Sequence, residues 1–441
     1  MDLFYKIVSI FLSLGIFGNA YLIKRIVGTW LFPGCLFSLF WFAYTFFPLV
    51  ILFEVPVNPL SILFISLATV IFSWSAVYFN WNKGFLLNEN KLPSSEIYNT
   101  RFLKKVLTYS VLISISCTVL QVKAQGISLS DMIFHPLETA GKYTVLKYTD
   151  KLNSSRYYIL SLLFAYISVL VGGLLHGSRQ SSKKKVKALI CFLPSIIVMF
   201  TQGAKGLVFL SLFLFLGSLM VTNFHDKKFD LLNYKNNIRV FKVTLLAIIG
   251  LSFSFFSRGL FNRELSYAFF KIRHYLTSYA FTHVYSFSDW FTAYMGGNAS
   301  QTYDTSNNFY GYYTFTAFAK YYGPKREALK GVYGEYFQYE DLIKSNIYTV
   351  FRGMIMDFSI IGTFIFIFIN GFLLNAIYYH FLKAKKPIIS LAVLSFMVGY
   401  FYITYIISLL TWNITILSFL FFIIILWINK YKFVFSKTQS S

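Results

Sequence analysis

About every forty residues the chain enters another apolar stretch long enough to cross a lipid bilayer. An apolar run of about 18 residues or more with almost no charge is typical of a spanning helix, because hydrocarbon offers bare backbone groups no hydrogen-bond partner. Eleven such stretches are predicted, at residues 3–23, 31–53, 57–79, 105–122, 157–175, 187–202, 206–223, 241–257, 357–380, 388–410 and 413–429. The sequence therefore predicts an all-α polytopic membrane protein with a single integral membrane domain over residues 1–441.

Lys and Arg accumulate in alternate gaps between these stretches. The gaps after the first, third, fifth, seventh and ninth stretches and the C-terminal tail, counted with the helix ends that border them, hold 23 of the 40 basic residues and four of the 17 acidic ones. The positive-inside rule makes this side cytoplasmic, so we expect the N-terminus outside and the C-terminus in the cytoplasm. The net charge of +23 is then mainly a topology signal beside anionic headgroups, and no nucleic-acid partner is predicted.

Two long connections fall on the predicted outer side, a smaller one at 123–156 and a larger, partly helical one at 258–350. The larger connection has 93 residues, and 15 of the chain's 33 tyrosines lie between Arg258 and Arg352. Tyrosine offers a flat apolar face and a hydroxyl group, which are the two partners that a sugar ring needs. An aromatic belt that rests on lipid headgroups is equally compatible with this composition.

The spanning stretches carry almost no charge at their centres, since Glu54, Lys205 and Asp357 lie near outer ends. Secondary transporters usually carry charged side chains at mid-membrane, so a coupled ion pathway is disfavoured, although a lipid flippase with a hydrated cavity stays open. The cytoplasmic gaps lack a Gly-rich phosphate loop, which disfavours an inward-facing nucleotide enzyme. The three cysteines lie singly in apolar stretches, and no grouping has metal-ligand spacing, so neither a metal site nor a cofactor is predicted.

Three cations lie at the outer ends of otherwise uncharged stretches. Lys205 begins a helix after the turn Thr201-Gln202-Gly203-Ala204, Arg258 follows the stretch 241–257, and Arg352 precedes the stretch 357–380. A helix N-terminus with a basic side chain attracts anions, and three cations at one membrane depth can converge on a diphosphate. Each cation alone is also explained as an interfacial residue that reaches the headgroups. Their joint occurrence favours a functional site.

At these segments the sequence resembles a family, the bacterial O-antigen or oligosaccharide repeat-unit polymerases. The similar motifs are Tyr21-Leu22-Ile23-Lys24-Arg25 with Leu39-Phe40-Trp41, the turn before Lys205, and the segment 346–362, which is similar to Asn-x-Tyr-Thr…Asp-Phe-Gly-x-x-Gly. Two departures are Lys205 where Arg is commoner and Ser359 where Gly is usual. Ligases that transfer finished polymer onto a lipid core look alike.

The resemblance implies a GT-C-like polymerase or ligase architecture and a metal-independent membrane glycosyltransferase in the bacterial cytoplasmic membrane. Its donor and acceptor would be undecaprenyl-pyrophosphate-linked oligosaccharides at the outer leaflet, used to build O-antigen, capsule or a similar polysaccharide. Membrane lipid and a chain-length regulator protein would be further partners. An O-antigen ligase, a lipid-linked oligosaccharide flippase and a purely structural or sensory membrane protein remain alternatives.

Such a reaction needs stabilisation of the leaving diphosphate and a base for the acceptor hydroxyl. We expect Arg258, Arg352 and Lys205 to bind the diphosphates. Further substrate or diphosphate contacts are expected from Arg263, Arg273, Asn346, Tyr348 and Asp357. The candidates for the base are Glu264, His274, His283 and Asp289. A single His in such a place is more often a structural hydrogen-bond partner than a base.

Overall fold

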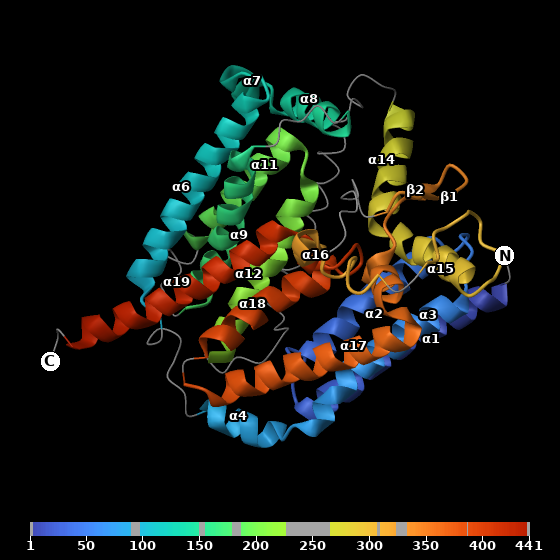
Figure 1. Cartoon of the computed structure of the whole chain (residues 1–441), viewed down its shortest axis with the longest axis horizontal. Coiled ribbons are helices and arrows are strands. Elements are labelled where there is room, and N and C mark those ends of the chain that lie inside the picture. The colour runs from blue at the N-terminus through green and yellow to red at the C-terminus, as the bar shows by residue number, and fades with distance from the viewer. Residues whose placement is uncertain are drawn as a thin grey trace. The chain divides into compact units, whose positions relative to one another are not determined.

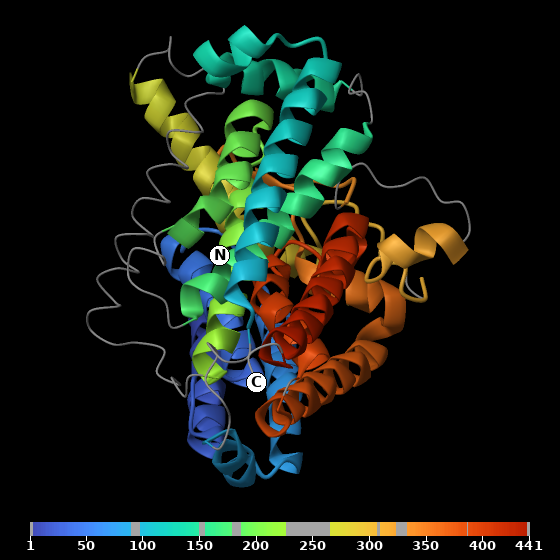
Figure 2. The same ribbon diagram turned by 90° about the vertical axis from the view of Figure 1, so that its left-hand side faces the viewer.

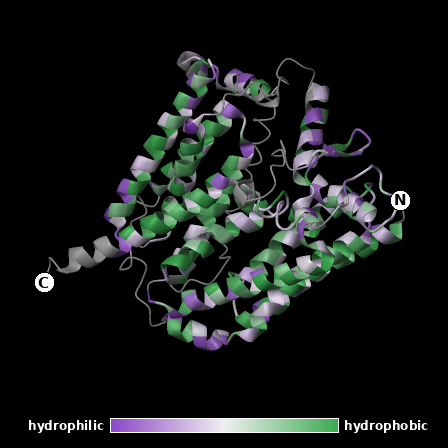
Figure 3. Ribbon diagram, viewed as in Figure 1, coloured by the Kyte–Doolittle hydropathy of each residue, from purple (hydrophilic) through white to green (hydrophobic). Residues whose placement is uncertain are grey.

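The computed structural model of the chain describes residues 3–89, 98–149, 155–178, 187–225, 265–306, 309–322, 333–385 and 387–438. These residues are mostly helical, and eight of their helices are long and apolar enough to cross a membrane. Hydrophobic residues predominate along these helices (Figure 3). The described chain is therefore that of an all-α polytopic membrane protein.

The chain divides into two compact units. Unit 1 consists of residues 1–85, 273–382 and 400–413, and unit 2 of residues 86–272, 383–399 and 414–441. The elements of unit 1 are α1 (Leu3–Val27), α2 (Pro33–Ile51), α3 (Pro59–Trp74), η1 (Ser75–Tyr78), α15 (Thr282–Tyr294), α16 (Thr316–Tyr322), β1 (Phe337–Tyr339), β2 (Ile343–Ser345), α17 (Thr349–Lys383) and η3 (Leu409–Thr411). The elements of unit 2 are α6 (Thr100–Ala124), α7 (Leu129–Phe134), α8 (Pro136–Tyr148), α9 (Arg156–Gly177), η2 (Leu189–Phe192), α11 (Leu193–Gln202), α12 (Lys205–His225) and α19 (Asn413–Thr438). Three helices have several residues in each unit, namely α4 (Trp81–Glu89), α14 (Leu265–Ala280) and α18 (Ile388–Ile403).

Ten of the eleven predicted stretches fall on described helices, and the stretch 241–257 lies outside the described residues. The predicted start of the stretch 357–380 is wrong, because α17 already begins at Thr349. Ser359 interrupts this helix with φ 62° and ψ 178°, a conformation that is almost confined to glycine. Two other stretches are shorter helices than expected: 187–202 opens with the 3₁₀ turn η2, and α18 ends at Ile403 rather than at 410.

In unit 1, α1, α2 and α3 pack side by side, and α17 lies against α3 (Figures 1 and 2). Gly371 of α17 makes this approach possible, because a β-carbon there would overlap the carbonyl oxygen of Phe72. Between the first three helices the amide of Asn19 donates to the hydroxyls of Ser38 (2.9 Å) and Ser73 (3.2 Å). These three buried polar side chains are thus paired with one another, as burial requires.

One end of unit 1 is held together by a buried lysine. Lys6 of α1 is fully buried and donates to the carbonyl oxygens of Leu52 (3.0 Å) and Val55 (2.8 Å) and to the hydroxyl of Tyr285 (2.9 Å). The carbonyl of Leu52 follows the last turn of α2, where the helix dipole favours a cation. Lys6 therefore fixes α15, which belongs to the long connection 258–350, to the ends of α1 and α2.

The described part of the long connection also contains α14, α16 and a hairpin. The strands β1 and β2 pair antiparallel, with Phe337 opposite Ser345 and Tyr339 opposite Ile343. The backbone N–H of Lys344 donates to the hydroxyl of Ser278 in α14 (3.1 Å). The hairpin is thereby joined to α14 in the described part of this connection.

In unit 2, α9 packs between α6 and α12, and the smaller connection 123–156 contributes α7 and α8. Val122, Ile127 and Tyr143 form a small apolar cluster where α6 meets this connection. The turn between α11 and α12 closes with Gly203 at φ 65°, the left-handed conformation that ends many helices. This turn is the one that carries Lys205.

Candidate functional site

The first turn of α17 places Arg352 inside unit 1. Thr349 opens the helix with φ 69°, its hydroxyl accepts the backbone N–H of Phe351 (3.3 Å), and the N–H of Val350 donates to the carbonyl of Thr404 (2.8 Å). These bonds fix the start of the helix and with it the direction of the arginine. Arg352 is only 1% exposed and lies within α17, so the expectation that it precedes the helix is wrong.

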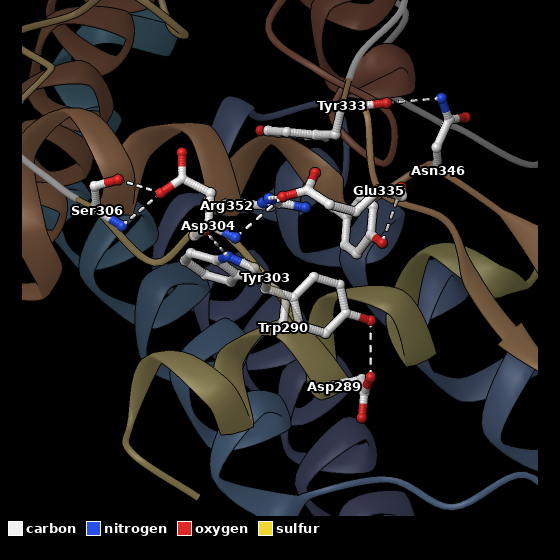
Figure 4. Close-up of polar contacts among 10 residues, drawn as sticks. Asp289, Trp290, Tyr303, Asp304, Ser306, Tyr333, Glu335, Asn346 and Arg352 are labelled. Carbon is white, nitrogen blue, oxygen red and sulfur yellow. Dashed lines mark hydrogen bonds and ion pairs between the residues drawn. The ribbon is translucent and has the colours of Figure 1, made fainter. Parts of the chain in front are cut away.

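Four aromatic rings surround the guanidinium of Arg352 (Figure 4), and we call them the aromatic cage. Its Cζ atom lies 4.1 Å from the ring centroid of Tyr333, 4.4 Å from that of Tyr348, 5.3 Å from that of Trp290 and 5.8 Å from that of Tyr303. A cation over an aromatic face is stabilised by the ring quadrupole, by about 2 kcal/mol or more when water is excluded. The cage therefore offsets part of the cost of burying this charge.

Hydrogen bonds at their outer edges hold the rings in place. The indole N–H of Trp290 donates to the carbonyl of Asp304 (3.0 Å), and the hydroxyl of Tyr303 donates to Asp289 (2.7 Å). Burial raises the pKa of Tyr303 and of Tyr333 well above the usual range of tyrosine, so both stay neutral. The cage therefore consists of uncharged rings, and hydrogen bonds hold Trp290 and Tyr303 in place around the guanidinium.

A carboxylate completes the site. Nη2 of Arg352 donates to Oε1 of Glu335 at 3.0 Å, and the same oxygen accepts the backbone N–H of Asp304 at 3.1 Å (Figure 4). The side chain of Glu335 is 26% exposed, so the carboxylate lies on the solvent side of the buried guanidinium. Two donors from different segments thus converge on one anionic oxygen.

Arg352 has more donors than this contact uses. Within the described ranges of the chain, its Nε and Nη1 atoms are buried and have no hydrogen-bond partner. Leaving a buried donor without a partner costs about 1–3 kcal/mol, and more for a charged group. The site therefore has unused capacity to bind an anion.

Two residues expected to contact substrate, a role that stays a prediction, bond to the segment that carries Tyr333 and Glu335. The amide of Asn346 donates to the carbonyl of Tyr333 (3.0 Å), and the hydroxyl of Tyr348 donates to the carbonyl of Glu335 (3.1 Å). Burial raises the pKa of Tyr348 to about 12, against the opposing effect of Arg352. These bonds fix the segment 333–335 beside the arginine.

Asp357 holds a tyrosine-rich loop. Its two carboxylate oxygens accept the backbone N–H groups of Tyr313 (3.0 Å) and Thr314 (2.7 Å). Gly353, one turn before, makes room for this loop, because a β-carbon there would lie 3.1 Å from the side chain of Tyr313. A carboxylate in this position gives no support to the expected binding of a diphosphate by Asp357.

The base candidates have different surroundings. Nδ1 of His274 lies 3.0 Å from the carbonyl oxygen of Asp341 and 3.1 Å from that of Leu342. Because carbonyls only accept, Nδ1 carries the hydrogen, and in the neutral ring Nε2 is left as a base. His283 is buried against the carbonyl of Tyr44 (2.9 Å), and burial lowers its pKa to about 4.

The carboxylate of Asp289 is already bound by neighbouring groups. Besides Tyr303 it accepts the backbone N–H of Ser300 (2.9 Å) and the hydroxyl of the same residue. Its position favours a structural role in the loop after α15. Arg273 of α14 is exposed, and its role as a diphosphate contact stays a prediction.

The expected convergence of Lys205, Arg258 and Arg352 lies partly outside the described residues. Arg258, Arg263 and Glu264 lie outside the described residues. Lys205 is half-buried at the first position of α12 in unit 2, whereas Arg352 belongs to unit 1. A joint diphosphate site formed by Lys205, Arg258 and Arg352 stays a prediction.

Sequence reasoning missed Glu335, Trp290, Tyr303 and Tyr333 as neighbours of Arg352. One signal was present, because Glu335 stands inside the aromatic run Tyr333-Gly334-Glu335-Tyr336-Phe337. Within the part of the chain that the structure describes, no three His, Cys, Asp or Glu residues are grouped as metal ligands, and metal independence stays a prediction. No protein-family model, curated protein or solved structure matches the chain.

Proposed function

We propose that the chain is a glycosyltransferase that polymerises undecaprenyl-pyrophosphate-linked oligosaccharide repeat units at the outer face of the bacterial cytoplasmic membrane. In this reaction the sugar hydroxyl of the acceptor unit attacks the anomeric carbon of the donor glycan. The bond from that carbon to the pyrophosphate oxygen breaks, and the lipid pyrophosphate leaves with the electron pair. The acceptor proton passes to a base.

The buried guanidinium of Arg352 is the observation that carries the proposal. It has two donors without partners among the described residues, and Glu335 is the carboxylate that meets it on the solvent side. Fixed donors in a site without water stabilise charge that develops on a leaving group, and one such contact is worth about 2.7–4 kcal/mol. Arg352 would serve the leaving pyrophosphate in this way, with Arg258 and Lys205 as further expected contacts.

Aromatic side chains near Arg352 suit the sugar part of the substrate. Tyr310, whose backbone N–H donates to the carbonyl of Asp357 (3.3 Å), is 89% exposed. Tyr336, next to Glu335, is 49% exposed. Exposed tyrosine faces beside a buried cation support a ligand that joins a glycan to a phosphate.

For the base, the surroundings support His274 over His283. The Nε2 atom of His274 has the lone pair in the neutral ring, and the ring is half-buried. His283 has its Nε2 bound to a backbone carbonyl and a pKa lowered to about 4. Glu264 remains a candidate from the sequence alone.

The test is deletion of the gene in its native host, followed by gel analysis of the surface glycan. A polymerase predicts loss of the ladder while one repeat unit stays on the lipid core. Loss of all repeat units from the core would indicate the O-antigen ligase or the flippase instead. For a capsule, single lipid-linked repeats should accumulate in place of polymer.

The deletion strain is then complemented with Arg352→Ala and Arg258→Ala, which should restore no polymer at normal protein levels in the membrane. Arg352→Lys should restore little, because a point charge cannot replace the guanidinium fork. Arg25→Ala is the matched control, since Arg25 also lies over a tyrosine ring, that of Tyr21 (4.8 Å), but is exposed. Full polymer from Arg352→Ala would show that the proposed site is misplaced.

A further inference from the structure

The ion pair between Arg352 and Glu335 is asymmetric. The guanidinium is 1% exposed, whereas the carboxylate side chain is 26% exposed and makes one hydrogen bond to it, at 3.0 Å. A bidentate pair would use two donors of the arginine. Here the carboxylate covers the cation from the solvent side without using its full donor set.

The backbone around Glu335 is held independently of its carboxylate. Its carbonyl accepts the hydroxyl of Tyr348 (3.1 Å), and the carbonyl of Tyr333 accepts the amide of Asn346 (3.0 Å). The preceding residue, Gly334, has open space on its side-chain face. The carboxylate can therefore rotate away while the main chain stays in place.

Part of the cage is held without the carboxylate. Tyr303 is anchored on Asp289, whereas Trp290 is anchored on the carbonyl of Asp304, whose N–H is itself bound to Glu335. A buried guanidinium with no anion is strongly unfavourable. The carboxylate is thus free to leave only when another anion takes its place.

The position of Oε1 marks where that anion binds. Nη2 of Arg352 and the backbone N–H of Asp304 both donate to it, at 3.0 and 3.1 Å. A phosphate oxygen at the same point would accept both bonds. Nε and Nη1 of Arg352 are buried donors that the carboxylate leaves without a partner among the described residues.

We propose that Glu335 is a built-in counter-ion that occupies the phosphate site between turnovers and yields Arg352 and the N–H of Asp304 to the pyrophosphate of the lipid-linked substrate. This inference rests on the proposed function. Glu335 is a positioning residue, because it keeps the guanidinium oriented in the empty site and competes with the ligand for it. Wild-type affinity for pyrophosphate is then lower than the site itself permits.

The test uses the full chain in phosphatidylcholine nanodiscs with inorganic pyrophosphate as the probe, and binding is measured by protection against thermal unfolding. Glu335→Gln should bind pyrophosphate roughly tenfold more tightly than wild type, because no competing charge has to be displaced. Glu340→Gln, an exposed carboxylate of the same hairpin, should bind as wild type does. Glu335→Asp, which keeps the charge but reaches less far, should fall between, and it serves if the Gln variant does not fold.

The outcomes separate this inference from the proposed function. Binding that needs Arg352 but is unchanged or weaker in Glu335→Gln overturns the counter-ion role and leaves the function standing. Absence of pyrophosphate binding in wild type, Glu335→Gln and Glu335→Asp alike counts against both. Equal protection by phosphatidylglycerol nanodiscs without pyrophosphate would assign the pair to a lipid headgroup and overturn its link to the substrate.

Discussion

Replacing Ser359 by glycine should stabilise the protein. Ser359 interrupts α17 with φ 62° and ψ 178°, and a non-glycine residue there stores about 1–3 kcal/mol of strain. Glycine removes the strain but gives the unfolded chain more freedom, which costs about 0.4–1 kcal/mol. The expected net gain is about 0.5–2 kcal/mol in the free energy of unfolding.

The chain contains a matched control. Ser66 of α3 is half-buried like Ser359, and the carbonyl of each accepts a threonine hydroxyl, from Thr69 (2.7 Å) and from Thr363 (2.6 Å). Ser66 lies within a regular helix, where the same change to glycine should cost about 0.5 kcal/mol. The two substitutions should therefore have opposite signs.

The assay is denaturant and thermal unfolding of the purified protein in one detergent. For a chain of this length 1 kcal/mol moves the midpoint by only about 1 °C, so the denaturant titration decides. Ser359→Ala retains the β-carbon and should bring no gain. If Ser359→Gly is no more stable than wild type, or if Ser359→Ala matches it, the strain assigned to this backbone is refuted.

Three further predictions concern pH, packing and topology. Because burial lowers the pKa of His283 to about 4, the unfolded state binds more protons than the folded state between pH 4 and 6.5. The free energy of unfolding should therefore fall by up to about 3 kcal/mol as pH drops through this window. In His283→Gln, unfolding measured at about pH 5 and 7.5 should not show this part of the pH dependence. Lys6→Met should lower the free energy of unfolding by about 2–4 kcal/mol, since it removes the ammonium that binds the buried carbonyls of Val55 and Leu52; Leu52 keeps the hydroxyl of Tyr285 as a donor. Lys24→Met at the other end of α1 should change it by under about 0.5 kcal/mol, and equal losses would contradict the role of Lys6. A reporter that is active only in the cytoplasm should give signal when it is fused after Lys185 or Lys386, and none when it is fused after Gly126 or Asn308. Signal after Asn308 would place the tyrosine-rich connection on the wrong side for the proposed substrate.

The spanning helices could be read from the sequence because hydropathy over a long run is a local property. The ends of the helices were harder to predict. α17 begins at Thr349, in a segment that includes Arg352 and Asp357, whose charged groups contact the aromatic cage and the backbone of a loop inside the protein. No local sequence pattern predicts such contacts. The break at Ser359 had one sequence signal, the glycine that similar motifs carry at this place.

The site itself could be predicted only in part. Arg352 was singled out as a cation at the end of an uncharged stretch, but Glu335 and Trp290 lie 17 and 62 positions before it in the chain. Pairings across such distances depend on how loops fold back on the helices, which residue spacing does not encode. The number of tyrosines can be read from the sequence, whereas the contact of several of them with one guanidinium depends on the three-dimensional structure.

The bond between Lys6 and Tyr285 can form only after most of the chain has been synthesised. The two residues are 279 positions apart, so at a synthesis rate of about 5–20 residues per second roughly 15–60 s pass between the emergence of the first and of the second. During this interval the lysine can bind the two carbonyls after α2 but lacks its third partner. The amino-terminal hairpin must therefore wait in the membrane with an incompletely covered charge, which makes this early intermediate the stage at which an insertase or a quality-control protease would meet the nascent protein.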